Sequence, residues 1–276
     1  MENAFEEIDW RRSWVELQEL RDEPGDAAIW DARAESFASR RVSSYSRKFV
    51  EYLQLDEGDS VLDMGCGVGD IAMLLARTGH EVYACDFSGK MLGYLGARMS
   101  EEGIQGIHPE RMAWEDDWSE HGLGPESVDV AIASRSIMVP DLGAILEKLN
   151  RTARKRVAVT LSVGCSPSED PVLLEAIGRS PKHQYDAIFC INMLFQMGYL
   201  PELRYITAEK TRRYATPEDA REYSLTRIGG LTDEERRTAI DFVDGHLERH
   251  DEEDSDRPYR LDYSISPKWA FISWKV

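Results

Sequence analysis

The sequence has few cysteines and histidines and no long apolar run. Its 276 residues include four cysteines, at positions 66, 85, 165 and 190, with neither a CxxC pair nor another metal-like spacing. Of the six histidines, His246 and His250 lie four apart on a predicted helix, but no third ligand has a suitable spacing. We therefore predict no metal site. No run of 18 apolar residues occurs and the acidic amino terminus lacks the layout of a signal peptide, so we expect a cytoplasmic protein that does not enter a membrane.

Basic residues are also scarce relative to acidic ones. Lysine and arginine total 33 against 51 aspartates and glutamates, which gives a formal net charge of −18. Such a chain repels the phosphate backbone, so nucleic acid is a poor candidate partner. The densest basic stretch, residues 151–156, is interpreted as a solvated helix end.

Strand-like and helix-like segments alternate through the middle of the chain. Apolar strands are predicted at residues 60–63, 81–85, 111–113, 128–133 and 157–163, with helices at 71–77, 91–99 and 142–153 between them. Further helices are predicted around Trp10 and Trp14 and over residues 31–53. This alternation is typical of a parallel sheet covered on both faces, and so of the α/β class.

The alternation changes after Gly164. Helices are predicted at 172–177 and 186–197, a strand at 203–207, helix starts at Thr216 and Thr232, and a last strand at 269–276. We interpret residues 1–276 as one domain with four consecutive parts. These are an N-terminal helical lid (1–55), a cofactor-binding core (56–163), a helical insertion over the substrate pocket (164–202), and C-terminal strands and helices (203–276).

The stretch VLDMGCGVGD, residues 61–70, places glycines at positions 65, 67 and 69 between two aspartates. A dinucleotide would place its pyrophosphate at the amino terminus of the following helix, where Asp70 would repel it. The GxGxxG spacing of dinucleotide-binding proteins is also absent. The loop is better suited to a ligand that needs close backbone approach and carries positive charge, and S-adenosylmethionine has both a sulfonium and an amino group.

VLDMGCGVG resembles the signature loop of the class I S-adenosylmethionine-dependent methyltransferases. VYACD followed by FSGKML is similar to the acidic end of their second strand, and Asp86 comes 23 residues after Asp63. The resemblance implies a Rossmann-like, seven-stranded, mostly parallel sheet whose last strand is antiparallel, with helical lid elements. It also implies S-adenosylmethionine as cofactor, with S-adenosylhomocysteine as product. WDARAESF at 30–37 is similar to the opening of the small-molecule branch that acts in quinone biosynthesis.

The resemblance also assigns site residues. It implies that Asp63 holds the methionine amino group and that Asp86 accepts both ribose hydroxyls, while Phe87 or Met91 packs on the adenine. Whether Trp114, Glu115 or Asp116 meets the adenine amino group stays open, as does whether Ser134 and Arg135 contact the cofactor or an anionic substrate group. The predicted cofactor-binding residues are Asp63, Gly65, Cys66, Gly67, Gly69, Asp86, Phe87, Met91, Trp114, Glu115, Asp116, Ser134 and Arg135. The predicted substrate-pocket residues are Trp30, Phe37, Tyr185, Phe189, Met193 and Tyr199.

We therefore expect an enzyme that transfers a methyl group to a small-molecule acceptor by in-line displacement, with no catalytic base identified. One alternative is a catalytically silent protein that binds S-adenosylmethionine or S-adenosylhomocysteine as a sensor or partner. Another is a protein methyltransferase, whose basic substrates would suit the negative charge. A dinucleotide oxidoreductase is disfavoured by the acidic loop. A homodimer is possible.

Overall fold

The computed structural model describes residues 7–21, 27–38, 43–208, 212–250 and 256–276, which form two compact units. Unit 1 comprises Met1–Leu161, Asp186–Ile206 and Ala270–Val276, and unit 2 comprises Ser162–Tyr185 and Thr207–Trp269. Each unit combines stretches that are distant in the sequence. The interpretation as one domain with four consecutive parts stays a prediction.

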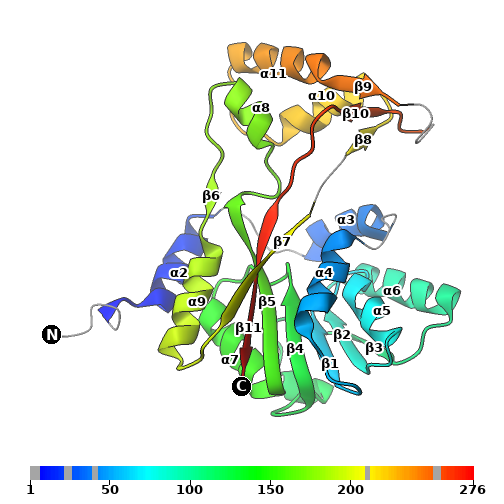
Figure 1. Cartoon of the computed structure of the whole chain (residues 1–276), viewed down its shortest axis with the longest axis vertical. Helices are drawn as coiled ribbons and strands as arrows, with labels where there is room; N and C mark the ends of the chain where they lie inside the picture. Colours follow the sequence, from blue (N-terminus) through cyan, green and yellow to red (C-terminus); the bar gives the residue numbers. More distant parts are fainter. Residues whose placement is uncertain (1–6, 22–26, 39–42, 209–211, 251–255) are drawn as a thin grey trace. The chain divides into compact units, whose positions relative to one another are not determined.

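The central sheet belongs to unit 1, and its strands follow the order β3-β2-β1-β4-β5-β11-β7. Their bounds are β1 Val61–Met64, β2 Val82–Asp86, β3 Ile107–Arg111, β4 Val128–Ser134, β5 Ala153–Cys165, β7 Glu202–Thr207 and β11 Lys268–Lys275. β1 to β5 pair in parallel. β11 runs antiparallel to β5, because Val276 at its end donates to the carbonyl oxygen of Lys155 near the start of β5 (Figure 1). The predicted Rossmann-like sheet with an antiparallel last strand is confirmed.

The centre of the sheet positions the site. All four residues of β1 are buried, as expected for a strand covered on both faces. Asp63 pairs in register with Ala84 of β2 and Ile132 of β4. Because these strands are parallel, their carboxyl ends meet at one edge of the sheet, and that edge is where open α/β sheets bind ligands.

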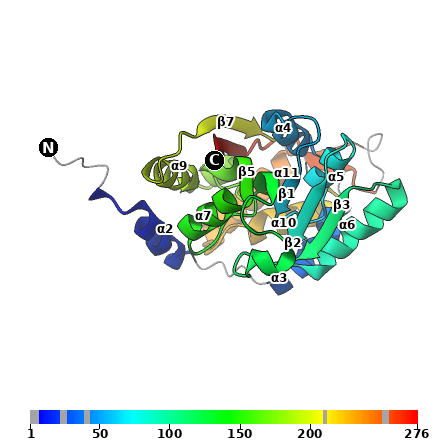
Figure 2. The same cartoon turned by 90° about the horizontal axis from the view of Figure 1, so that it is seen from below.

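Two groups of helices pack on this sheet (Figures 1 and 2). α4 packs against α5 and α3 against α6, whereas α2, α7 and α9 pack against one another. Their bounds are α2 Trp10–Glu19, α3 Ala27–Ala38, α4 Ser44–Leu53, α5 Asp70–Ala76, α6 Gly89–Glu102, α7 Leu142–Thr152 and α9 Asp186–Gln196, with a 3-10 turn η1 at Trp118–His121. Right-handed crossovers place α5 and α6 on one face and α7 on the other, because the strand order reverses at β1.

Several predictions of local structure are corrected. The helix predicted over 31–53 is two helices, α3 and α4, and residues 39–42 between them lie outside the described residues. The third strand covers Ile107–Arg111, ahead of the predicted 111–113. The basic residues 154–156 do not end a helix but begin β5. His246 caps α11 while His250 follows β9, so the two histidines do not share a helix.

Unit 2 has its own small sheet and core. Its elements are α8 Pro171–Ala176, β6 His183–Gln184, β8 Arg213–Tyr214, α10 Pro217–Thr226, α11 Asp233–Gly245, β9 Leu247–Arg249 and β10 Tyr259–Leu261. β10 pairs antiparallel with both β8 and β9, and β6 pairs with the end of β5. α10 and α11 begin after Thr216 and Thr232 as predicted, and both threonines form capping boxes. Among the described residues of the whole chain, no helix is long and apolar enough to cross a membrane.

Candidate functional site

The three glycines of the loop after β1 all have left-handed backbone conformations, with φ of +74° at Gly65, +57° at Gly67 and +80° at Gly69. A Cβ added to Gly65 would lie 2.3 Å from the Cβ of Ser136, and one added to Gly69 would lie 2.3 Å from Cδ1 of Leu95. A Cβ on Gly67 would meet nothing within 4 Å. Protein packing therefore requires the outer two glycines, whereas the middle one faces open space that a ligand can enter.

Asp63 lies at the end of β1 with only 1% of its surface exposed. Its carboxylate accepts a hydrogen bond from the backbone N–H of Ala72, but Oδ2 is buried and has no hydrogen-bond partner among the described residues. Burial, together with the nearby charge of Asp86, raises the pKa of Asp63 to about 7. A buried carboxylate oxygen without a donor destabilises the protein, and a ligand ammonium group would relieve this.

Asp86 joins the end of β2 to the glycine loop. Its Oδ2 accepts from the backbone N–H of Gly67 at 2.8 Å, and its Oδ1 accepts from the backbone N–H of Ser88 at 2.9 Å. Burial raises its pKa, and these two hydrogen bonds oppose the rise. Because each carboxylate oxygen has a second lone pair, Asp86 keeps acceptor capacity for two further donors.

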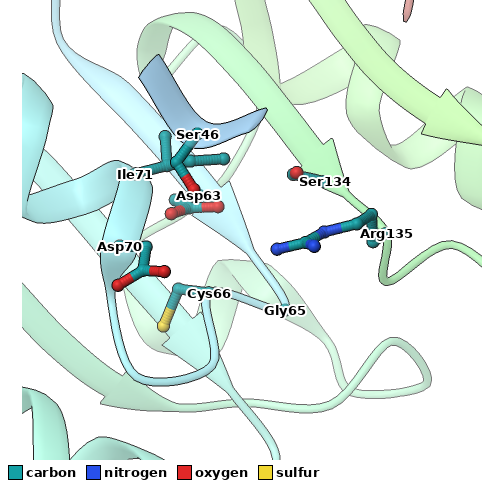
Figure 3. Close-up of a pocket in the computed structure, with 8 residues that line it drawn as sticks. All are labelled: Ser46, Asp63, Gly65, Cys66, Asp70, Ile71, Ser134 and Arg135. Carbon is teal, nitrogen blue, oxygen red and sulfur yellow. The ribbon is translucent and has the colours of Figure 1, made fainter. Parts of the chain in front are cut away.

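A pocket opens between the glycine loop and the ends of β1 and β4 (Figure 3). The carboxylates of Asp63 and Asp70 and the guanidinium of Arg135 approach it from β1, α5 and the segment after β4. Its lining residues are Ser46, Asp63, Gly65, Cys66, Asp70, Ile71, Ser134 and Arg135. The fold thus brings together five of the residues predicted from the sequence, at positions 63, 65, 66, 134 and 135.

Sequence reasoning did not include Ser46, Asp70 or Ile71 among the site residues. Asp70 follows directly on the glycine loop, and its position in the quoted motif was the signal. It pairs with Arg98 at 2.9 Å, and Arg98 also donates to the carbonyl oxygen of Val68, so this arginine fixes the loop from α6. Ser46 lies on α4, and its local sequence carries no such signal.

A buried hydrogen-bond network beside the pocket was also missed. The hydroxyl of Tyr45 lies 2.9 Å from the Oγ of Ser134 and 2.6 Å from the Oγ1 of Thr160. Tyr45 is fully buried, which raises its pKa, so its phenol stays protonated near neutral pH. The guanidinium of Arg135 lies over this ring, 4.1 Å from the centroid. Arg135 has a left-handed backbone conformation, and its backbone N–H donates a hydrogen bond to Oγ1 of Thr160. Tyr45 therefore orients Ser134 at the end of β4 and Arg135 directly after it.

Several other predicted cofactor residues do not line this pocket. Met91 is buried in a cluster with Val68 and Ala34. Phe87 is partly buried, and Trp114 is 9% exposed, its indole N–H donating to the carbonyl oxygen of Ser136. Glu115 and Asp116 are exposed. The choice among residues 114–116 stays open.

The predicted substrate-pocket residues lie in several places. Trp30 and Phe37 of α3 pack on the Met91 cluster beside the glycine loop. Phe189 makes edge contacts with the two tryptophans of α2, Met193 is buried, and Tyr199 lies near Trp274 of β11. Tyr185 belongs to unit 2 and is 56% exposed. None of the six lines the pocket of Figure 3, and their role in acceptor binding stays a prediction.

Comparison with known proteins agrees with this geometry. Residues 61–156, which span β1 to the start of β5, match the family described as methyltransferase domain. The chain therefore contains a methyltransferase domain at residues 61–156, in agreement with the predicted class I S-adenosylmethionine-dependent methyltransferase. A Haemophilus influenzae homologue of this methyltransferase, described as an uncharacterized protein, is 32% identical over 257 residues, covering 90% of this chain and 88% of its own.

Solved structures share the fold of the methyltransferase. An S-adenosylmethionine-dependent methyltransferase from Aquifex aeolicus matches with a TM-score of 0.51 and 18% identity, covering 64% of this chain and 92% of its own. The YcgJ protein from Bacillus subtilis matches with a TM-score of 0.52 and 13% identity, covering 84% and 97%. The closer resemblance to the quinone-biosynthesis branch stays a prediction.

S-adenosylmethionine is the cofactor of the family, and the residues present fit it. The open space at Gly67 admits a ligand to the backbone, and the unpartnered Oδ2 of Asp63 is suited to an ammonium group. Asp86 has acceptor capacity for hydroxyl donors. Within the described ranges, no group of three or more His, Cys, Asp or Glu side chains is placed to hold a metal ion.

Proposed function

We propose that this methyltransferase transfers the methyl group of S-adenosylmethionine to a small-molecule acceptor by in-line displacement. The observation that carries the proposal is the pairing of an open left-handed Gly67 with a buried carboxylate oxygen at Asp63 that has no donor. Bound there, the cofactor supplies a methyl group on a positively charged sulfur, which is an excellent leaving group. The chain's own residues then have to position the two reactants and exclude water.

Each site residue has a role in that positioning. Asp63 holds the amino group of the cofactor. Asp86 accepts from the ribose, and the hydrogen bond that it accepts from the backbone N–H of Gly67 keeps the glycine loop in place. Tyr45 forms a hydrogen bond with Ser134, and its ring packs against the guanidinium of Arg135. Arg135 contacts either the cofactor or an anionic group of the acceptor. A general base is needed only when the acceptor atom carries a proton near neutral pH.

A small acceptor is favoured over a protein. The resemblance of residues 30–37 to small-molecule enzymes supports it, and α3 packs its aromatic residues beside the loop. The excess of 18 negative charges would suit a basic protein substrate and keeps a protein methyltransferase as the second candidate. A silent binding protein is the third candidate.

Two measurements test the proposal. Isothermal titration calorimetry should give binding of S-adenosylhomocysteine and none of NADH, and Asp63→Asn should weaken the binding at least about tenfold through loss of a charge-assisted hydrogen bond. The protein is then incubated with methyl-labelled donor and a small-metabolite extract or a protein extract. Label in the small-metabolite fraction supports the proposal, and label in protein only contradicts it. No label in either fraction, with intact S-adenosylhomocysteine binding, favours the silent protein.

A further inference from the structure

The two edge strands of the central sheet differ in how they are protected against pairing with another strand. β3 forms one edge and contains Pro109, which has no backbone N–H to donate. Among the described strands β7 forms the other edge, and its sequence ELRYIT contains neither proline nor lysine (Figure 1). An edge strand without these residues is a template for a further strand.

The backbone of β7 directs alternate residues away from the sheet. Ala208, directly after β7, donates its backbone N–H to the carbonyl oxygen of Pro267, directly before β11, so these two strands are antiparallel. Because backbone groups alternate in direction along a strand, the even-numbered residues of β7 face β11. Val276 agrees with this, since its N–H donates to β5 and the odd-numbered residues of β11 are left to face β7. Leu203 and Tyr205 therefore direct their N–H and C=O groups outward.

The side chains of these two residues form an exposed apolar surface. Leu203 is 42% exposed and Tyr205 56%, and Leu200, close before the strand, is 81% exposed. Ile206, on the opposite face of β7, is fully buried. A strand added beside β7 would thus cover apolar side chains as well as backbone groups.

The charges of β7 favour one way of pairing with its own copy. A two-fold axis makes the two strands antiparallel, and it passes through a residue because outward-facing residues must lie opposite each other. An axis through Glu202 or Arg204 places that residue against its own copy, and like charges directly opposite are destabilising. An axis through Tyr205 places Arg204 opposite Ile206. An axis through Leu203 places Glu202 of each copy opposite Arg204 of the other.

The axis through Leu203 also satisfies the outward backbone groups. Leu203 exchanges both of its backbone hydrogen bonds with Leu203 of the second copy, and the N–H of Tyr205 donates to the carbonyl oxygen of Pro201 of the second copy. Pro201 has no N–H to donate in return. The carbonyl oxygen of Tyr205, which lacks that donor, accepts from the hydroxyl of Tyr52 on α4 at 3.4 Å. The chain itself thus supplies the donor that this register lacks.

We propose that β7 pairs with β7 of a second copy of this chain across a two-fold axis through Leu203. The backbone hydrogen bonds of Leu203 and Tyr205 join the copies, and a Glu202–Arg204 pair forms on each side of the axis. Within one chain Arg204 lies 3.7 Å from Glu202 and over the ring of Tyr52, which holds its guanidinium on the face where the pairs form. None of these residues lines the pocket of Figure 3, so the interface does not depend on the proposed methyl transfer.

Analytical ultracentrifugation of the full chain tests for this dimer. A concentration series up to about 0.1 mM covers interfaces of ordinary strength, and about 0.15 M sodium chloride screens the repulsion between two acidic chains beyond roughly 8 Å. The protein should sediment as a monomer and dimer in reversible equilibrium. A monomer throughout the series would overturn the proposal.

Charge variants test the register. Glu202→Lys puts a lysine opposite Arg204, and Arg204→Glu puts a glutamate opposite Glu202, so each variant alone should dimerise at least about tenfold more weakly. An equal mixture of the two variants restores opposite charges on both sides of the axis and should associate at least about tenfold more tightly than either alone. Contacts within each chain are unchanged by mixing, so a mixture that associates no better contradicts the register.

Glu16→Lys on α2 is the matched control for charge. It makes the same substitution in another exposed ion pair, with Arg12, and should dimerise like the unaltered protein. Weakening equal to that of Glu202→Lys would show that β7 is not the interface. Calorimetric binding of S-adenosylhomocysteine, measured on every variant, reports on folding.

Cysteine variants locate the axis. Leu203→Cys should give a disulfide-linked dimer under mild oxidation, because Cα atoms of directly opposite, hydrogen-bonded residues lie about 5.5 Å apart, within disulfide range. Tyr205→Cys should not, because the two copies of that residue lie four positions apart along the ladder, or roughly 13 Å. The unaltered protein measures the background from its four cysteines. Cross-linking through position 205 and not 203 would contradict the proposed axis.

Discussion

Gly65, Gly67 and Gly69 share a left-handed backbone but differ in what a side chain would meet. Only at Gly67 is there room for a Cβ, so alanine there strains the backbone without a clash. We expect Gly67→Ala to lower the free energy of unfolding by about 1–2 kcal/mol, the usual cost of a left-handed alanine. The same methyl group would occupy the space proposed for the cofactor, so the affinity for S-adenosylhomocysteine should fall more than about tenfold.

Gly79 offers a control for this substitution. It follows α5 with φ of +89° and also has nothing within 4 Å of an added Cβ. Gly79→Ala should therefore cost similar stability in thermal unfolding and leave calorimetric binding unchanged. Equal effects of the two substitutions on binding would show that the open space at Gly67 does not serve the cofactor.

The raised pKa of Asp63 predicts that the stability of the folded protein depends on pH. Its folded pKa, about 7, lies above the ordinary value of 3.8, so the folded protein holds more protons than the unfolded chain between these pH values. The free energy of unfolding should therefore fall as the pH rises from about 4 to 7, by roughly 3–5 kcal/mol from this group, and change little above. Asp63→Asn should flatten this slope in urea unfolding. A slope equal to that of the unaltered protein would contradict the assignment.

The same carboxyl predicts how cofactor affinity changes with pH. An ammonium group binds the ionised form of Asp63, so the affinity for S-adenosylhomocysteine should rise from about pH 5.5 to 7.5, by at most about tenfold per pH unit. Calorimetry on Asp63→Asn should give weaker binding with little pH dependence. A variant that keeps the full pH dependence would assign it to another group.

The sequence was sufficient to predict that Asp63 and Ser134 line one site, because parallel strands bring their carboxyl ends to one edge of the sheet. It was not sufficient for Tyr45. That residue reaches the site through contacts with Ser134 and Thr160, which lie 89 and 115 residues away in the chain. No local sequence pattern indicates a hydrogen bond between residues that are so far apart in the chain.

At the scale of elements, caps decide where the helices of unit 2 begin. Thr232 accepts from the backbone N–H of Glu235 at 3.2 Å, and the Glu235 side chain accepts from the backbone N–H of Thr232 at 2.7 Å. Thr232→Ala removes one of these hydrogen bonds and should destabilise α11 by about 1 kcal/mol. Amide hydrogen exchange in α11 measures this directly.

Thr238 supplies the matched control on the same helix. It is exposed, and its hydroxyl donates to the carbonyl oxygen of Glu234 within the helix. Thr238→Ala should leave exchange unchanged or slow it, because alanine has the higher helix propensity. Faster exchange in both variants alike would show that the cap is not the cause.

Strands were predictable where burial is continuous. β1 and most of β2 and β4 are buried, and their apolar runs appear in the sequence at nearly the observed bounds. Only the first residue of β3 is buried, so its sequence lacks an apolar run and the strand was placed too late. The first residues of β5 after Ala153 are polar and exposed or half-buried, which explains why they resembled a helix end.

At the scale of the whole molecule, charge is the dominant feature. The 51 acidic side chains outnumber the 33 basic ones, and the described ion pairs are mostly solvent-exposed, where each contributes little. Repulsion among the excess carboxylates opposes the folded state, and salt screens this repulsion. The same charge supports the prediction that nucleic acid is not a partner, while self-association stays a prediction.

Salt should therefore raise the apparent Tm of this methyltransferase near neutral pH. Going from about 0.02 M to about 0.5 M sodium chloride shortens the screening length from roughly 20 Å to about 4 Å, which removes most long-range repulsion but little of the energy of contacts at 3 Å. Near pH 5 the net charge approaches zero, because the isoelectric point is about 4.8, so the rise in Tm should shrink there. Differential scanning calorimetry at both pH values measures this. An equal rise in Tm at both pH values would point to a general effect of salt on apolar surface. A fall in Tm near neutral pH would mean that local ion pairs outweigh the repulsion of the net charge.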